Sequence, residues 1–138
     1  MDNINNQDYV SDFLPVISYN DSGWNENIVS FLNAILSDLN ILIFIIQEHW
    51  LLESNLYKLD KVFNDFDVFA LPATKSNSRI SKGRPSGDIA IFVKNNLSAT
   101  SKRLICPNSK RVQGLQFCLE NKSFVIKNCY FPGHVSHS

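Results

Sequence analysis

The sequence has no apolar run long enough to cross a membrane. Its longest run, residues 41–46, has six residues, whereas a membrane-spanning helix needs about 20. The first residues are acidic and polar, and they lack the basic segment and apolar stretch of a secretory signal. Glycine and proline number only five each, which excludes a collagen-like or low-complexity chain. We therefore expect no membrane partner.

Cysteine is also scarce. Cys106, Cys118 and Cys129 are odd in number and lack the spacing of metal ligands, so we interpret them as reduced thiols, mostly on strands, of an intracellular protein. The chain does have 44% hydrophobic and 12% aromatic residues over its 138 positions. This composition is enough for one packed domain and argues against wholesale disorder.

The net charge of zero conceals an uneven distribution. Residues 1–67 contain eleven Asp and Glu against two Lys and Arg, a net charge of −9, whereas residues 68–138 contain two against eleven, a net charge of +9. The basic half fits an anionic partner such as nucleic acid. The alternative is that the two halves attract each other within one fold, and the charges alone leave both open.

The first half of the chain predicts a strand, a helix and a second strand. We expect a strand over residues 16–20 and a helix capped by Asn25, whose apolar stripe between Ile28 and Leu39 packs on a sheet. Residues 41–46 are rich in β-branched side chains without alternation, which is typical of a strand buried on both faces. This order fits a crossover between parallel strands.

The remainder predicts mostly strands, with one long loop. We expect a flexible tail over residues 1–12, a helix over 51–63 and a polar, basic loop over 74–87. Further strands are predicted by apolar and β-branched runs at residues 67–71, 89–93, 97–105, 115–119 and 123–126 and before residue 132. The fold class is therefore α/β.

Glu48 and Asn20 are the most informative polar residues. Glu48 follows the buried strand, and Asn20 ends the strand before it. If these strands are parallel neighbours, both side chains emerge at the carboxyl edge of the sheet, where α/β proteins bind ligands. One carboxylate and one amide suit Mg²⁺, which keeps several waters. A solvated strand end is the simpler interpretation.

Five segments in order resemble a known family. Residues 18–24 (Ser-Tyr-Asn-Asp-Ser-Gly-Trp) and 45–51 (Ile-Ile-Gln-Glu-His-Trp-Leu) are similar to the first two motifs of the endonuclease/exonuclease/phosphatase superfamily. Residues 83–87, 111–115 and 128–132 resemble segments of the apurinic-endonuclease-like domain of non-LTR retrotransposons. The resemblance implies the N-terminal part of a two-sheet α/β sandwich, with residues 13–138 forming an incomplete domain.

The resemblance also implies an activity and a set of site residues. The activity would be a phosphodiester hydrolase, dependent on Mg²⁺ or Mn²⁺, that nicks DNA to prime reverse transcription. Glu48 would ligate the metal, Asn20 would help to form that centre, and Tyr130 would approach the scissile phosphate. DNA-backbone contacts, which position a duplex without reading its sequence, would come from four residues of the basic loop: Lys75, Arg79, Lys82 and Arg84.

The chain departs from the family pattern in three ways. Ser22 stands where the family often has a second acidic residue, and Asp88 stands where the retrotransposon version has a glycine, a change expected to disturb a turn. The later motifs that orient and activate the attacking water have no counterpart. His134 and His137 have no acidic partner before them and are interpreted as solvated. We therefore expect little or no cleavage by this chain.

Two alternatives to a DNA-cleaving fragment stay open. One is a non-catalytic DNA-binding remnant, and the other is a phosphoesterase of the same fold that acts on a phospholipid or inositol phosphate. We expect Trp24 and Trp50 to serve in packing rather than as wedges in DNA, and His49 to pack away from Glu48. The expected location is intracellular, and nuclear in an active retroelement.

Overall fold

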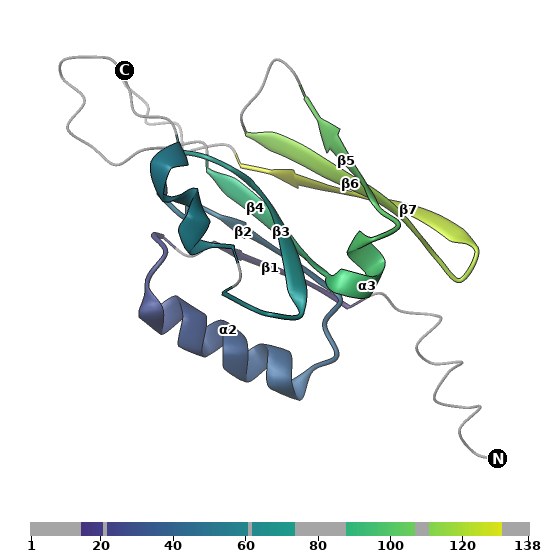
Figure 1. Ribbon diagram of the computed structural model, residues 1–138, viewed down its shortest axis with the longest axis horizontal. Helices are drawn as coiled ribbons and strands as arrows, with labels where there is room; N and C mark the ends of the chain where they lie inside the picture. The colour runs from purple at the N-terminus through teal and green to yellow at the C-terminus, as the bar shows by residue number, and fades with distance from the viewer. Residues whose placement is uncertain (1–14, 21, 61, 74–87, 107–110, 131–138) are drawn as a thin grey trace, which may run out of the picture.

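The computed structural model describes residues 15–20, 22–60, 62–73, 88–106 and 111–130. These residues form two β-sheets, one of which is covered by helices (Figure 1). The expected tail over residues 1–12 and the whole of the expected loop over 74–87 lie outside the described residues. None of the helices in the described part of the chain has the length and hydrophobicity that crossing a membrane requires.

The four-stranded sheet has the order β1-β2-β4-β3. Its strands are β1 (Val16–Asn20), β2 (Ile43–Gln47), β3 (Phe66–Leu71) and β4 (Ile89–Lys94). Strands β1 and β2 are parallel, as the strand–helix–strand order predicts, and Asn20 stands opposite Gln47. Strand β4 runs antiparallel to both of its neighbours.

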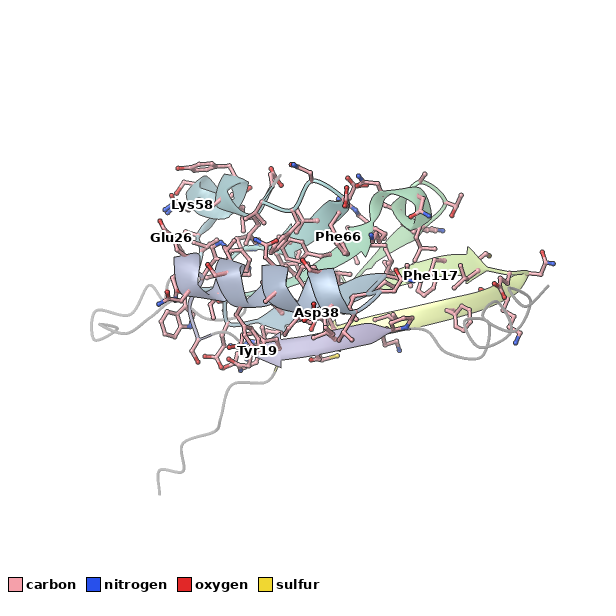
Figure 2. All side chains as sticks on the ribbon, turned by 90° about the horizontal axis from the view of Figure 1, so that it is seen from below. Tyr19, Glu26, Asp38, Lys58, Phe66 and Phe117 are labelled. Carbon is pink, nitrogen blue, oxygen red and sulfur yellow. The ribbon has the colours of Figure 1, made fainter. Side chains whose placement is uncertain are left out.

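The helix between β1 and β2 is α2 (Glu26–Asp38). Asn25 caps it as predicted, because its side chain accepts a hydrogen bond of 3.1 Å from the backbone N–H of Ile28. Leu32 is fully buried against the sheet. Phe31, at the margin of the stripe, is half exposed and contacts the ring of Tyr19 on β1, a residue labelled in Figure 2.

Strand β2 is buried on both faces, as its composition predicts. Phe44 and Ile46 pack on the helix side, where the Phe44 ring stacks on Phe92 of β4 with centroids 4.4 Å apart. Ile43 and Ile45 face the other way, toward the second sheet. The four-stranded sheet is therefore the central layer of the molecule.

The second sheet is three-stranded, antiparallel and ordered β5-β6-β7. Its strands are β5 (Lys102–Ile105), β6 (Val112–Leu119) and β7 (Lys122–Cys129). Leu115 and Phe117 of β6 are buried against the central layer. The β6–β7 hairpin turns through Glu120 and Asn121, both with positive φ, which matches the right-handed twist of a two-residue hairpin.

Two expected elements differ in the structure. The helix expected over residues 51–63 is only a 3₁₀ segment, η1 (Glu53–Lys58); Leu59 and Phe63, outside it, reach the core from the following turn, so their spacing resembled a longer helix. The strand expected over residues 97–105 is a short helix, α3 (Asn95–Ser98), followed by β5. Leu97 is buried from that helix.

Candidate functional site

Three strand ends from two sheets meet at one edge of the molecule. Asn20 is the last residue of β1, Glu48 follows β2, and Tyr130 follows β7. Because β1 and β2 are parallel, their carboxyl ends lie side by side. The amide nitrogen Nδ2 of Asn20 donates a hydrogen bond of 2.7 Å to Oε2 of Glu48. The structure thus brings these two side chains together, as the strand order predicts.

Tyr130 joins them from the second sheet. Its hydroxyl lies close enough to the side chain of Glu48 for the two groups to interact. Burial raises the pKa of the Tyr130 hydroxyl above 10.0, and the interaction with the negatively charged Glu48 acts in the same direction. The hydroxyl therefore stays protonated at neutral pH. Glu48 thus accepts a hydrogen bond from Asn20 and lies beside the Tyr130 hydroxyl, so it meets residues from two other strand ends.

The backbone that presents Glu48 is left-handed. Glu48 has φ of 62° and Trp50 has φ of 63°, a conformation that costs non-glycine residues about 1–3 kcal/mol each and that gathers at functional sites. The N–H of Glu48 donates to the carbonyl of Asp88 at 2.9 Å, and its carbonyl accepts from the N–H of Gly23 at 2.7 Å. The turn at residues 48–50 is therefore fastened on both sides.

Gly23 is required where it lies against this turn. Its φ is 104°, and a Cβ atom built there would stand 2.5 Å from Cε3 of the Trp50 ring. Trp50 thus packs directly on the glycine backbone. Trp24 packs in the core, stacked on Phe92 and edge-on to Phe63, in agreement with the packing role expected for it.

Asp88 has a role that the sequence did not indicate. The glycine loop that it was expected to disturb lies outside the described residues, whereas the Asp88 side chain is described and is fully buried. One carboxylate oxygen, Oδ2, accepts a hydrogen bond from the backbone N–H of Trp50. Asp88 therefore supports the turn that carries Glu48. Sequence reasoning missed this role because the partner is a backbone group 38 positions away.

His49 points into the interior, away from the exposed edge. It is fully buried; its Nε2 lies 2.9 Å from the carbonyl of Leu71, and its Nδ1 accepts from the N–H of Leu51 at 3.0 Å. These partners assign a neutral imidazole with the proton on Nε2. Burial lowers the pKa of His49 below its ordinary 6.5, although the nearby Asp88 opposes this shift. His49 is thus a packed, hydrogen-bonded residue, as expected.

A buried amide cluster holds the two sheets together beneath the site. Asn128 of β7 accepts from Nε2 of Gln47 at 2.9 Å and donates to Oε1 of Gln113 at 3.0 Å. Its Nδ2 also lies 3.3 Å from the carbonyl of Ile46 and 3.1 Å from that of Ala90. The sequence placed Asn128 in a motif but gave no sign of these partners, which come from both sheets.

Comparison with known proteins identifies the fold. No family model and no curated protein matches the sequence. Among solved structures, the AP endonuclease LMAP from Leishmania major matches with a TM-score of 0.64 and 14% identity, over 87% of this chain and 42% of that one. The fold of this chain therefore resembles part of the fold of that AP endonuclease. The catalytic domain of APE2 from Xenopus laevis matches with a TM-score of 0.51 and 17% identity, over 85% of this chain and 45% of that one.

The chain spans less than half the length of those structures. The expected two-sheet α/β sandwich is therefore confirmed, and it corresponds to one part of the neighbours' fold. At these identities the likeness concerns the fold, whereas function has to be argued from the site.

The donor atoms at the edge of this AP-endonuclease-like fold fit a sparsely coordinated cation. No group of three or more His, Cys, Asp or Glu side chains gathers anywhere in the described ranges. At the meeting point of the strand ends, Glu48 is partly exposed and offers a carboxylate to solvent. So sparse a donor set suits Mg²⁺, which keeps several waters. Because Asn20 touches Glu48 directly, an ion would lie on the open side of the carboxylate, and Asn20 is better placed to orient Glu48. Direct ligation by Asn20 stays a prediction.

Of the other residues expected at or near the site, six lie outside the described residues and Ser22 lies within them. Four of them, Lys75, Arg79, Lys82 and Arg84, lie outside the described residues, as do His134 and His137. Ser22, which replaces the family's second acid, is exposed, and its backbone N–H lies 3.3 Å from Oδ1 of Asn20.

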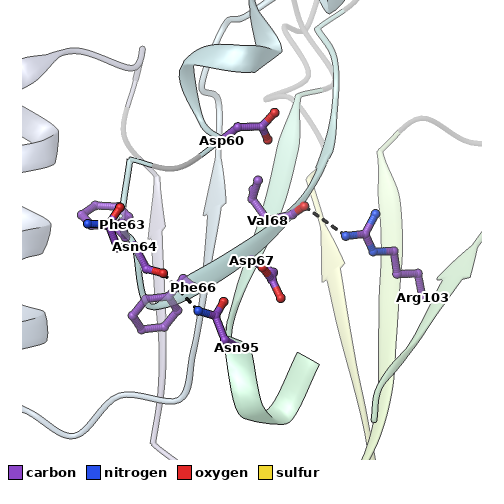
Figure 3. Close-up of a pocket in the computed structure, with 8 residues that line it drawn as sticks. All are labelled: Asp60, Phe63, Asn64, Phe66, Asp67, Val68, Asn95 and Arg103. Carbon is purple, nitrogen blue, oxygen red and sulfur yellow. Dashed lines mark hydrogen bonds between the residues drawn. The ribbon is translucent and has the colours of Figure 1, made fainter. Parts of the chain in front are cut away.

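A separate cavity of about 380 Å³ lies at the opposite end of the four-stranded sheet (Figure 3). Phe66 at its wall stands opposite Lys94, the last residue of β4, whereas Gln47, next to Glu48, stands opposite Ile89, the first. Arg103 closes one side by donating to the carbonyl of Val68 at 3.2 Å. None of Asn20, Glu48 and Tyr130 lines this cavity.

Proposed function

We propose that this chain carries the metal-binding part of a DNA-cleaving phosphodiesterase site, centred on Glu48. The observation that supports it is the contact of Asn20, Glu48 and Tyr130 at one edge of an AP-endonuclease-like fold. The three residues come from separate strand ends, which indicates a built site rather than a chance surface cluster. DNA as the substrate is proposed from the solved neighbours, both named as AP endonucleases or their relatives.

Each residue has a role that follows from its contacts. Glu48 offers its open carboxylate lone pairs to a divalent cation, Mg²⁺ or Mn²⁺, which would neutralise the charge that develops on phosphate oxygens. Asn20 fixes the carboxylate by donating to one of its oxygens. Tyr130 keeps its proton beside Glu48 and reaches the same place from β7, where a phosphate oxygen would be its partner.

We further propose that cleavage by this chain is weak. Among the described residues, His49 is the only histidine, and both of its ring nitrogens are engaged in the interior. A positioned general base contributes typically ~10²–10⁴-fold to such a reaction. The five sequence segments favour a non-LTR retrotransposon as the source, which would place the protein in the nucleus.

A plasmid-nicking assay tests the site. With Mg²⁺ or Mn²⁺ we expect slow conversion of supercoiled to nicked DNA, stopped by EDTA and reduced at least tenfold by Glu48→Gln. Asp67→Asn is the matched control, because Asp67 is an exposed carboxylate on β3 that lines the cavity remote from the site. Nicking that survives Glu48→Gln would contradict the assignment of Glu48.

The excess of basic residues over positions 68–138 favours a second candidate, a DNA-binding remnant without activity. Such a remnant would bind duplex DNA with an affinity that falls steeply with salt, since phosphate contacts release counterions, and it would not nick. Turnover of an inositol phosphate or phospholipid headgroup without DNA binding would instead support the alternative of a phosphoesterase of the same fold. Fluorescence anisotropy of labelled duplex DNA across a salt series measures the DNA binding on which this distinction depends.

A further inference from the structure

Two N–H groups of the strained turn that carries Glu48 bond to the same residue outside the proposed metal site. Asp88 accepts twice from it: its carbonyl takes the N–H of Glu48 at 2.9 Å, and its carboxylate takes the N–H of Trp50. These two N–H groups flank the segment at positions 48–50, both ends of which are left-handed. A single buried residue thus holds the turn at both of its strained positions.

The Asp88 carboxylate is kept in the interior at a cost. Its side chain is fully buried, and within the described part of the chain its Oδ1 atom has no hydrogen-bond partner. The His49 Nδ1 atom, 3.9 Å from Oδ2, accepts from Leu51 and so gives the carboxylate no proton. A buried carboxylate with one unpaired oxygen needs an explanation. Here the explanation is the hydrogen bond that its other oxygen accepts from the N–H of Trp50.

We infer that Asp88 is a positioning residue that presents Glu48 to a divalent cation by anchoring the N–H of Trp50. The inference rests on the proposed function, because it takes Glu48 as the metal ligand. Without the anchor, Trp50 would leave its left-handed conformation, and the backbone of Glu48 would turn with it. The Glu48 carboxylate would then lose its alignment with Asn20 and Tyr130. Asp88 touches neither DNA nor metal in this scheme.

The test compares two substitutions of Asp88 by Mn²⁺ binding, measured through the loss of free-ion signal in electron paramagnetic resonance. Asp88→Ala removes the acceptor, and we expect Mn²⁺ affinity to fall at least tenfold, as for other residues that orient metal ligands. Asp88→Asn keeps an oxygen acceptor for Trp50, and we expect affinity within about threefold of the parent protein, consistent with a hydrogen-bond role. Asp67→Asn should leave the affinity unchanged. Equal losses in both Asp88 variants, or no loss in either, would overturn the inference.

A second measurement tests the hydrogen bond between the N–H of Trp50 and Asp88 without any substitution. Amide hydrogen exchange of the unsubstituted protein should show the N–H of Trp50 protected to the same degree as the strands of the central sheet. Rapid exchange of this amide would overturn the inference even if Asp88→Ala fails to fold. If the unsubstituted protein binds no Mn²⁺, the proposed function fails, whereas protection of Trp50 would still show the anchor to be intact.

Discussion

Replacing Asn128 by aspartate should damage the fold more than removing its side chain. The Nδ2 group of Asn128 faces three acceptors, the carbonyls of Ile46 and Ala90 and the Oε1 atom of Gln113. The Oδ1 atom of Asn128 accepts one hydrogen bond, from the side chain of Gln47. A carboxylate of the same shape would keep the contact with Gln47 but would turn an oxygen toward three other oxygens, in a fully buried position.

The size of the effect follows from counting the partners. Asn128→Ala leaves the side chains of Gln47 and Gln113 each short of a partner, which costs about 1–3 kcal/mol per group and thus about 2–6 kcal/mol in the free energy of unfolding. Asn128→Asp keeps the contact with Gln47 but loses the donor to Gln113, which costs about 1–3 kcal/mol. It also adds an unpaired buried charge, for which about 3–5 kcal/mol is typical, so we expect a total loss of about 4–8 kcal/mol. Such a loss is comparable to the total stability of a small domain.

Urea denaturation followed by circular dichroism measures both changes. Gln116→Glu is the matched control, because Gln116 is exposed on β6, and the same amide-to-acid change there should cost less than about 0.5 kcal/mol. The penalty of Asn128→Asp should shrink toward pH 4, where the introduced carboxyl gains a proton to donate. If Asn128→Asp and Gln116→Glu unfold at the same urea concentration, the amide cluster does not hold the sheets together.

Three further outcomes are expected. Gly23→Ala should lower the melting temperature and alter the fluorescence of Trp50, because a Cβ there meets the indole at 2.5 Å and φ of 104° strains any other residue; an unchanged spectrum would refute this contact. Asn25→Ala should cost about 1 kcal/mol in urea denaturation, since it removes the cap of α2, whereas a change near zero would contradict the capping role. Burial holds the pKa of His49 below 6.5 in the folded chain, so the unfolded chain binds more protons at acidic pH. The contribution of His49 to the free energy of unfolding is therefore fully present above about pH 6.5. As the pH falls below that value, the contribution decreases by at most about 1.4 kcal/mol per pH unit. Urea midpoints at pH 7.5 and pH 5 should therefore differ less in His49→Gln than in the parent protein, and equal differences would argue against a buried neutral histidine.

The parts of the fold that the sequence predicts are those set by local patterns. The cap at Asn25, the apolar stripe of α2 and the unbroken apolar run of β2 each act within one element, so their periodicity is visible in the chain. Parallel pairing of β1 and β2 then brings Asn20 and Glu48 together. Part of the candidate site could therefore be located from the residues alone.

The remaining features depend on partners that are distant in sequence. The spacing of Leu59 and Phe63 resembles a helix, but a turn after η1 places them on the core equally well. Asp88 looked like a misplaced charge because its partner is the backbone of Trp50. Asn128 likewise depends on amides and carbonyls from the opposite sheet. Local periodicity carries no information about such contacts.

Glu48 and Tyr130 follow strands of different sheets, so the candidate site forms only when the two sheets are packed together. Glu48 follows a strand of the central layer, and Tyr130 follows a strand of the three-stranded layer. A compact intermediate with intact strands but undocked layers would keep its far-ultraviolet circular dichroism and lose the contact between these side chains. Metal binding at this edge would then appear only in the last step of folding, when the two sheets pack together.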